Sequence, residues 1–247
     1  MKAAALIFRL RVPIFVLLYL LGFLAPWNIR GGRSGTLWLA ASTLFYRTGR
    51  IGLSGATLAV TITALASLAM GAVLRVWGTA YLGSGVMSGL ALQGDALVAA
   101  GPYRYVRNPL YLGSWLLALG VSILMPPDGA LFFLLSFSAF VFFLISAEER
   151  FLAAKQGDAY RQYLLQVPRL LPRMQQPTGA LPSLHPQWLA ALLAETYSIA
   201  ITICFAVFAW RYNARILIRC VLICYGLSLV VRALAKPSAK VGEANWF

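Results

Sequence analysis

Long apolar segments separated by short connectors constrain this chain more than any other feature of its sequence. Lipid offers the backbone no hydrogen-bond partners, so only helices and closed barrels can span it, and segments of this length suit helices. The sequence therefore predicts an all-α, polytopic transmembrane helical bundle with about six spans. The expected spans are residues 4–27, 53–76, 110–125, 130–147, 188–210 and 216–234.

The charge content agrees with a membrane protein. Only 11% of the residues are charged, against about 25% in soluble domains. The net charge of +14 would suggest nucleic acid as the partner of a soluble protein. Arginines in cytoplasmic loops and against anionic lipid headgroups explain it better here, so we predict no nucleic-acid binding. We expect an integral membrane protein of the bacterial inner membrane, and the sequence leaves its oligomeric state open.

The connectors divide the chain into three parts. Residues 1–52 contain the first span and a short apolar patch, residues 37–46, which we interpret as an interfacial or re-entrant piece. Residues 53–173 form the core. Residues 174–247 contain a proline-rich connector and the last two spans.

The third and fourth spans are joined only by residues 125–129, a tight turn without lysine or arginine. We therefore expect a helical hairpin whose tip faces away from the cytoplasm. Its base brings residues 101–109 and 148–173, which are distant in sequence, together on the cytoplasmic side. Within the second segment, Gly157 is expected to end one helix and Asp158 to cap the next.

The base of this hairpin contains the most informative polar residues. The chain has only 7 acidic residues, and two of them, Glu148 and Glu149, are adjacent. The single histidine, His185, cannot build a zinc site, and the three cysteines lie inside apolar segments, so we predict no metal. Arginine, glutamate and tyrosine remain as the candidate functional side chains.

Such a set of side chains can bind a zwitterion without a metal. S-adenosylmethionine is one such ligand, because its carboxylate suits arginine, its ammonium suits glutamate, and its sulfonium is tolerated near aromatic faces. Methyl transfer from it to a thiolate or an amine is an in-line displacement. The protein then needs chiefly to position and desolvate the acceptor, and to remove its proton where it has one.

Two sequence blocks resemble a known family. Residues 101–113, G-P-Y-R-Y-V-R-N-P-L-Y-L-G, resemble the signature G-x-Y-x-x-x-R-H-P-x-Y-x-G of isoprenylcysteine carboxyl methyltransferases and related phospholipid methyltransferases. Residues 148–172 resemble their second signature, E-E-x-x-L…G…Y…Y…V-P-R-x-x-P. The helix end around Arg75, Trp77 and Tyr81 is also similar, and the resemblance covers about residues 55–173.

The resemblance implies a membrane enzyme that binds S-adenosylmethionine in a cytoplasmic cradle between the two blocks. Its acceptor would be a lipid or prenylated substrate from the bilayer: an isoprenylcysteine-like carboxylate or thiol, or an amine-headed lipid. One wall of the cradle would contain Tyr103, Arg107, Asn108, Pro109 and Tyr111. The other would contain Glu148 and Glu149, supported by Tyr160, Tyr163 and Arg169. The catalytic residues would be Arg107, Asn108 and Glu149.

Two residues depart from the family pattern. Asn108 replaces the usual histidine, and asparagine keeps a donor and an acceptor but cannot titrate near neutral pH. Leu144 stands where many members have arginine. Two alternatives therefore stay open: a non-catalytic membrane protein that keeps the fold, and a membrane reductase of related helix arrangement that uses a nicotinamide cofactor.

Glu195 is the one acidic residue expected inside a span. An ionisable side chain in this environment is costly, and it is usually paired or functional. We expect Arg232 to be the candidate partner at the most similar depth. Arg75, beside Trp77 at the end of the second span, is expected at the membrane interface.

Overall fold

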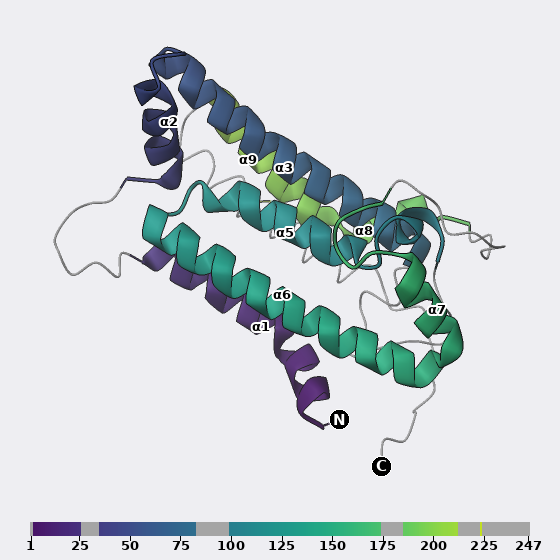
Figure 1. Ribbon diagram of the computed structural model, residues 1–247. Coiled ribbons are helices and arrows are strands. Elements are labelled where there is room, and N and C mark those ends of the chain that lie inside the picture. Colours follow the sequence, from purple (N-terminus) through teal and green to yellow (C-terminus); the bar gives the residue numbers. More distant parts are fainter. Residues whose placement is uncertain (1, 26–34, 83–98, 174–184, 212–222, 224–247) are drawn as a thin grey trace.

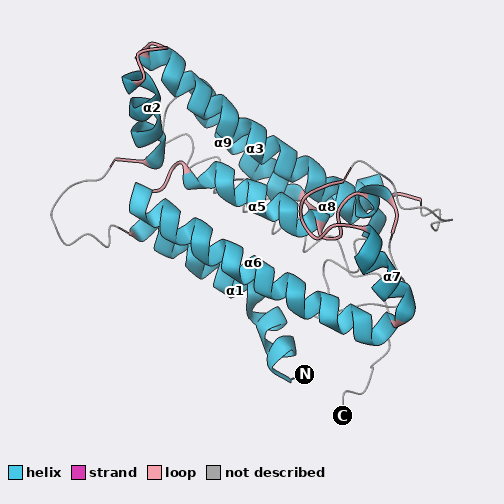
Figure 2. Cartoon of the chain, in the orientation of Figure 1, coloured by secondary structure: helices cyan, strands magenta, loops and turns pink. Residues whose placement is uncertain are grey.

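The computed structural model describes residues 2–25, 35–82, 99–173, 185–211 and 223, and every regular element in these ranges is helical. The predicted all-α fold is confirmed for them. The elements, shown in Figures 1 and 2, are α1 (Lys2–Leu24), α2 (Leu37–Arg47), α3 (Leu53–Leu82), the 3-10 turn η1 (Gly101–Arg104), α5 (Pro109–Ser122), α6 (Pro127–Gln156), α7 (Asp158–Gln166), α8 (Trp188–Ala194) and α9 (Thr196–Arg211).

Two of these helices, α3 and α6, are long and apolar enough to cross a bilayer. The pair α8 and α9, bent by 65° at Glu195, makes a third span if it is counted as one. The apolar part of α1 and the whole of α5 are shorter. The described residues thus contain two or three candidate spans, and the predicted number of six is not confirmed. The sixth predicted span, residues 216–234, lies outside the described residues.

The helices form two layers (Figure 1). Helix α1 packs on α6 in one layer, and in the other α3 packs on α5 and also contacts α2, α8 and α9. The hairpin of α5 and α6 connects the layers, with α2 near its tip and α7 at its base. The predicted hairpin is confirmed.

Glycines set the close crossing of α3 and α5. A Cβ atom on Gly71 would lie 2.7 Å from the carbonyl oxygen of Gly113, and one on Gly113 would lie 2.8 Å from that of Gly71. Membrane helices associate through such close packing, because apolar burial gives little net driving force in lipid. The crossing brings Arg75, one turn beyond Gly71, against the first turn of α5.

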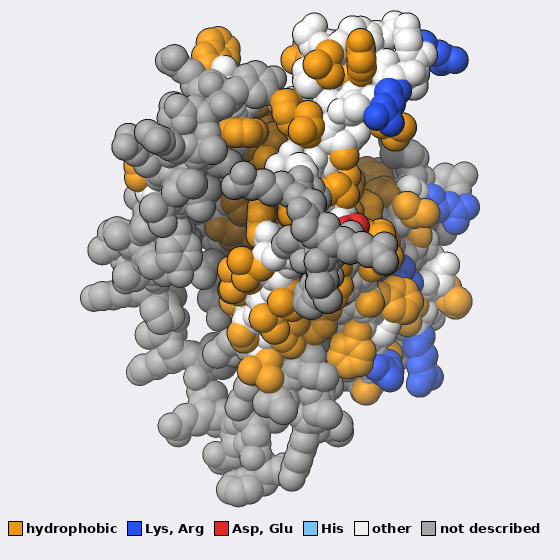
Figure 3. Space-filling model, turned by 90° about the vertical axis from the view of Figure 1, so that its left-hand side faces the viewer, with side chains coloured by type: hydrophobic (Ala, Val, Ile, Leu, Met, Phe, Trp, Pro, Cys, Tyr) orange, Lys and Arg blue, Asp and Glu red, His pale blue; other side chains and the backbone are white. Residues whose placement is uncertain are grey.

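Aromatic rings fill the layer between α1 and α6. The ring centroids of Tyr19 and Phe133 are 4.6 Å apart, and those of Phe15 and Phe137 are 5.0 Å apart. Large apolar side chains are also exposed on the outside, for example Leu58 of α3 and Leu135 of α6. Figure 3 shows such side chains over much of the described surface at the α2 end, with basic side chains along one side. A surface of this kind suits contact with lipid.

The patch 37–46 forms a helix, α2, and its interfacial or re-entrant position stays a prediction. The side chain of Thr36 caps its first turn by accepting from the N–H of Leu39. The N–H groups of Leu37 and Trp38 donate to the carbonyls of Met125 and Ile123, at 2.7 and 2.8 Å. These bonds attach α2 to the tip of the hairpin.

Several predicted boundaries were wrong. Helix α3 continues to Leu82, and α6 continues past Ala147 to Gln156 as one helix. Gly157 ends α6 as predicted, with a φ of 61°, which glycine tolerates best. Asp158 is the first residue of α7, and its predicted capping role is not seen, since Gly157 occupies the cap position without a side-chain hydrogen bond.

Candidate functional site

The two sequence blocks lie directly on one another at the base of the hairpin. The N–H of Arg107 donates to the carbonyl of Pro168 at 2.9 Å, and the N–H of Arg173 donates to the carbonyl of Tyr105 at 3.0 Å. The hydroxyl of Tyr163 donates to the carbonyl of Tyr103 at 2.7 Å. These three hydrogen bonds confirm the predicted meeting of the two regions.

Glycine and proline shape the first block. Gly101 has a φ of 57°, and a Cβ atom there would overlap the ring of Tyr81, so both conformation and space favour glycine. Pro109 begins α5, where its missing N–H costs no helical hydrogen bond. Asn108 precedes it at the cap position, but its side chain makes no capping bond. The amide of Asn108 is thus available to the second block.

Glu149 joins the two blocks through its side chain. It is 5% exposed, and its Oε1 accepts from Nδ2 of Asn108 at 3.2 Å and lies 3.5 Å from Nε of Arg107. Its Oε2 pairs with Nη2 of Arg169 at 2.5 Å. The same Asn108 nitrogen also donates to the backbone carbonyl of Arg169 at 3.1 Å. Three of the predicted site residues, Arg107, Asn108 and Glu149, are therefore brought into contact.

Glu148 faces a different set of groups. The hydroxyl of Tyr111 lies beside its carboxylate, and Arg11 of α1 is the nearby cation. The Tyr103 side chain is buried, and its hydroxyl has no hydrogen-bond partner among the described residues. Burial, followed by the negative charge of Glu148, raises the pKa of Tyr103 well above its ordinary range. Tyr103 is therefore a neutral donor at physiological pH.

Two tyrosines of α7 support this arrangement. The rings of Tyr160 and Tyr163 lie 5.8 Å apart and pack with Ala99 and Val167 in a small core. Burial is the main cause that raises the pKa of both phenols. They fix α7 against the first block as neutral side chains.

Leu144 lies one turn before Glu148 and is fully buried. It forms a small cluster with Ala147, against which the rings of Phe15, Tyr111 and Phe140 pack. Where many family members have an arginine, this chain thus has an apolar layer beneath Tyr111 and Glu148.

The segment that carries most of this site matches a known family. Residues 59–159 match the family model described as phospholipid methyltransferase. The predicted family resemblance is confirmed. The chain is also 33% identical over 114 residues to the protein-S-isoprenylcysteine O-methyltransferase of Schizosaccharomyces pombe. That match covers 44% of this chain and 48% of the relative, so the chain spans about half the length of the curated relative it matches. No solved structure matches the chain.

A second buried carboxylate lies outside the segment that matches the methyltransferase family. Glu195 is fully buried and forms a bidentate pair with Arg75, through Nε at 2.7 Å and Nη2 at 2.9 Å. The predicted partner, Arg232, lies outside the described residues. Arg75, predicted at the membrane interface, has a side chain only 9% exposed that points into the protein. The sequence shows both residues as ionisable groups in apolar segments. It does not show how far along their helices the two residues lie relative to each other.

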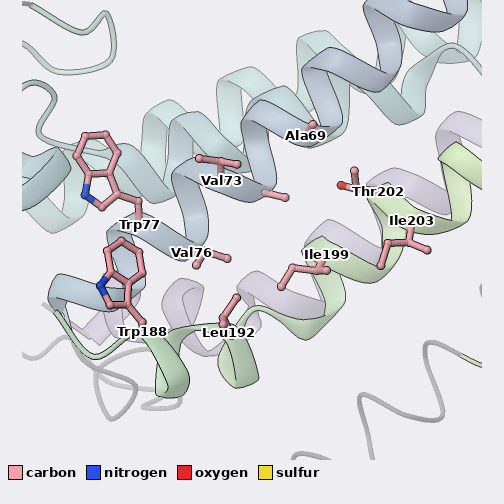
Figure 4. A pocket seen from close by; sticks show the side chains of 10 residues that line it. Ala69, Val73, Val76, Trp77, Trp188, Leu192, Ile199, Thr202 and Ile203 are labelled. Carbon is pink, nitrogen blue, oxygen red and sulfur yellow. The ribbon is translucent and has the colours of Figure 1, made fainter.

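An apolar groove of about 520 Å³ lies between α3 of the family segment and the bent pair α8–α9. Trp77 and Trp188 lie at one end of it, and Thr202 and Ile203 lie at the other (Figure 4). The hydroxyl of Thr202 donates to the carbonyl of Ser198 at 2.9 Å. The Trp77 ring centroid is 6.2 Å from that of Tyr105 in the first block, so this end of the groove borders the site.

Proposed function

We propose that this protein is an integral membrane methyltransferase that uses S-adenosylmethionine and methylates a lipidic acceptor. The main observation in support is the contact of the two family blocks around Glu149, at the base of the hairpin. The family model and the curated relative are both named for methyl transfer. We further propose that the site lies on the cytoplasmic face.

The arginines around Glu149 would receive the carboxylate of the cofactor. Glu149 already has Arg107, Arg169 and Asn108 at its two oxygens, so it acts best as the brace that orients these donors. The side chain of Arg169 is 34% exposed and can turn one nitrogen toward a ligand. Arginine binds carboxylates through two nitrogens at once, which suits this role.

Glu148, together with Tyr103 and Tyr111, would receive the cationic part of the cofactor. A carboxylate stabilises an ammonium or a sulfonium, and aromatic faces add to this stabilisation. The Tyr103 hydroxyl is buried and lacks a partner among the described residues, and buried polar groups normally have one. A ligand that accepts a hydrogen bond here would supply it. Pro109 and Tyr111 would complete the wall on α5.

Asn108 limits the proton chemistry of the site. Its amide can orient Glu149 or a ligand, but it cannot take a proton at neutral pH. A carboxylate or thiolate acceptor arrives without a proton and needs no base. An amine acceptor needs one, and Glu148 is the carboxylate of the site that lies beside Tyr111, apart from the arginines around Glu149. Glu148 would then be the base.

The groove beside the site suits the hydrocarbon tail of the acceptor. It is lined almost entirely by apolar side chains, and its one hydroxyl, that of Thr202, is already hydrogen-bonded. Because its tryptophan end borders Tyr105, a tail in the groove would place the headgroup near the first block. We therefore propose this groove as the tail site.

Calorimetric titration of the detergent-solubilised protein with S-adenosylhomocysteine tests the cofactor part of the proposal. We expect about micromolar affinity, and loss of binding in the double variant Arg107→Ala/Glu149→Gln. Arg150→Ala is the matched control, because Arg150 is exposed and lies outside the contacts of Glu149. No binding by folded wild-type protein would favour the non-catalytic alternative, and binding of a nicotinamide cofactor instead would favour the reductase.

The acceptor is tested by transfer of a labelled methyl group. Isoprenylcysteine analogues and amine-headed lipids should be supplied in separate reactions. Label in an ester would identify a carboxylate acceptor, label in a thioether would identify a thiol, and label in a methylated amine would identify the headgroup. No label in any product, with S-adenosylhomocysteine still bound, would contradict a lipidic acceptor.

A further inference from the structure

Arg75 connects three helices through a single guanidinium group. Its Nε and Nη2 pair with Glu195, at the junction of α8 and α9. Its Nη1 donates to Oγ of Ser114 at 2.6 Å and to the carbonyl of Leu110 at 3.3 Å, both on α5. The Tyr197 ring lies 5.0 Å from the guanidinium carbon. The position of this group is thus fixed from α5 and α9 at once.

Glu195 is held as firmly as Arg75. Besides the arginine, the hydroxyl of Thr79 donates to its Oε1 at 2.9 Å and the hydroxyl of Ser198 to its Oε2 at 3.2 Å. Its side chain is fully buried. The bend of 65° between α8 and α9 occurs at this residue, and the backbone carbonyl of Glu195 accepts from Ser198. The carboxylate therefore cannot move away from Arg75 without leaving the charge of that arginine unpaired.

The contacts of Arg75 on α5 lie next to the proposed cofactor wall. Leu110 follows Pro109 directly, and Asn108, which binds Glu149, is two residues before it. The N–H of Leu112 donates to the carbonyl of Asn108 at 3.0 Å, so Leu110 and Asn108 share one helical turn. A displacement of the Arg75 guanidinium would therefore move this turn, because Arg75 is hydrogen-bonded to the Leu110 carbonyl and to Ser114.

We propose that Glu195 is a positioning residue for the methyltransferase site: it fixes Arg75, and Arg75 fixes the first turn of α5, with Asn108 and Pro109. This inference rests on the proposed function. It gives the α8–α9 pair, which lies outside the segment that matches the family, a part in forming the site. Glu195 itself touches no ligand in this proposal.

A purely structural role for the pair makes a different prediction. A buried ion pair pays a large desolvation cost, and replacing both partners by apolar residues of similar volume is often neutral for stability. The double variant Arg75→Met/Glu195→Met should therefore fold. If the pair only holds helices together, this variant binds ligand as the wild type does. If the pair positions the wall, the variant is folded but its ligand affinity falls.

A second variant separates the charge from the geometry. Arg75→Lys keeps a cation beside Glu195, but a single ammonium cannot contact Glu195, Ser114 and the Leu110 carbonyl with the three directions of a guanidinium. Thr79→Val is the matched control, since it removes one donor to Glu195 and leaves every contact of Arg75 in place. Both variants keep the charge pair in the membrane.

The test combines ligand affinity with a measurement that needs no ligand. For Arg75→Met/Glu195→Met we expect S-adenosylhomocysteine to bind about tenfold more weakly, with Arg75→Lys weakened in the same direction and Thr79→Val unchanged. Hydrogen exchange of the amides at residues 109–114 should become faster in the first two variants, while the α1–α6 layer keeps its protection.

The outcomes distinguish the two proposals. Wild-type affinity and unchanged exchange in the double variant would overturn the positioning role and leave the proposed function standing. No ligand binding by the wild type would count against the proposed function, and the exchange of the α5 turn would still decide whether Glu195 and Arg75 set its position. Faster exchange throughout the protein would show general loosening and would also contradict the inference.

Discussion

Glu149 and Glu195 are both buried carboxylates paired with arginine, but their surroundings differ. Glu149 lies where two polar segments meet at the base of the hairpin, and the side chains of its partners, Arg107 and Arg169, are 12% and 34% exposed. Glu195 lies between helices, and the side chain of Arg75 is 9% exposed. The first carboxylate is thus reached from an open edge, whereas the second is enclosed.

The difference shows which pair can take part in ligand binding. An arginine at an open edge can exchange part of its contact with glutamate for a ligand carboxylate, because water can solvate it during the exchange. An arginine enclosed among apolar helices cannot do so without the cost of an unpaired charge. We therefore assign exchange to the Glu149 cluster and fixed geometry to the Glu195 cluster. The predictions below test this division.

The largest effect is expected from Glu195→Ala. This substitution removes the partner of a buried guanidinium and should lower the free energy of unfolding by about 3 to 5 kcal/mol. Thermal unfolding in detergent would measure it, with Arg75→Met/Glu195→Met as a control that removes both charges and restores most of the loss. A Glu195→Ala protein that melts like the wild type would contradict the enclosed pair.

Arg169→Ala should have the opposite balance of effects. It removes a nitrogen at Oε2 of Glu149, and the proposed donor to the cofactor carboxylate, so S-adenosylhomocysteine should bind about tenfold more weakly. The stability loss should be smaller than for Glu195→Ala, because Glu149 keeps Asn108 and Arg107, and the pair is screened by solvent. Calorimetric titration and thermal unfolding of the same preparation would show this reversal, and equal binding would remove Arg169 from the site.

The sequence predicts the Glu149 cluster far better than the Glu195 cluster, for a physical reason. Residues 101–109 and 148–173 are brought together by two neighbouring helices, α5 and α6, and a tight turn, and all three are visible in the local sequence. The contact of Glu195 with Arg75 depends instead on how far α3 is shifted along α5 and α9. That shift is set by close packing, as at Gly71 and Gly113, which no local pattern encodes.

Helix boundaries were missed for a related reason. The sequence predicts the end of a span at Ala147, before Glu148 and Glu149, because charges are expected at the membrane surface. The residues that follow them, such as Ala153 and Lys155, favour helix formation, so α6 continues until Gly157. No proline or glycine near Glu195 predicts the bend there. The bend follows from the tertiary contacts of the Glu195 carboxylate.

Tyr103→Phe should separate ligand binding from stability on the Glu149 side. The hydroxyl has no partner among the described residues, so its loss should leave the melting temperature unchanged or raise it. Affinity for S-adenosylhomocysteine should fall about fivefold, because the ligand loses a buried neutral donor. Tyr163→Phe is the matched control. It removes the bond to the Tyr103 carbonyl and should lower stability by about 1 kcal/mol. Unchanged affinity in Tyr103→Phe would exclude a contact between this hydroxyl and the cofactor.

The smallest effect concerns the groove on the Glu195 side of the molecule. Ala69 lines it, and Ala69→Phe would place a ring where the acceptor tail is proposed to lie. We expect the KM for a lipidic acceptor to rise about threefold, because the ring would remove apolar contacts worth about 0.7 kcal/mol of binding free energy. The affinity for S-adenosylhomocysteine should stay the same. Ala66→Phe is the control, since Ala66 is also exposed on α3 but does not line the groove. For an acceptor with a shorter tail, Ala69→Phe should leave the KM unchanged, because only a tail that reaches Ala69 can contact the ring. Equal KM values for the two variants would show that the acceptor tail does not lie in this groove.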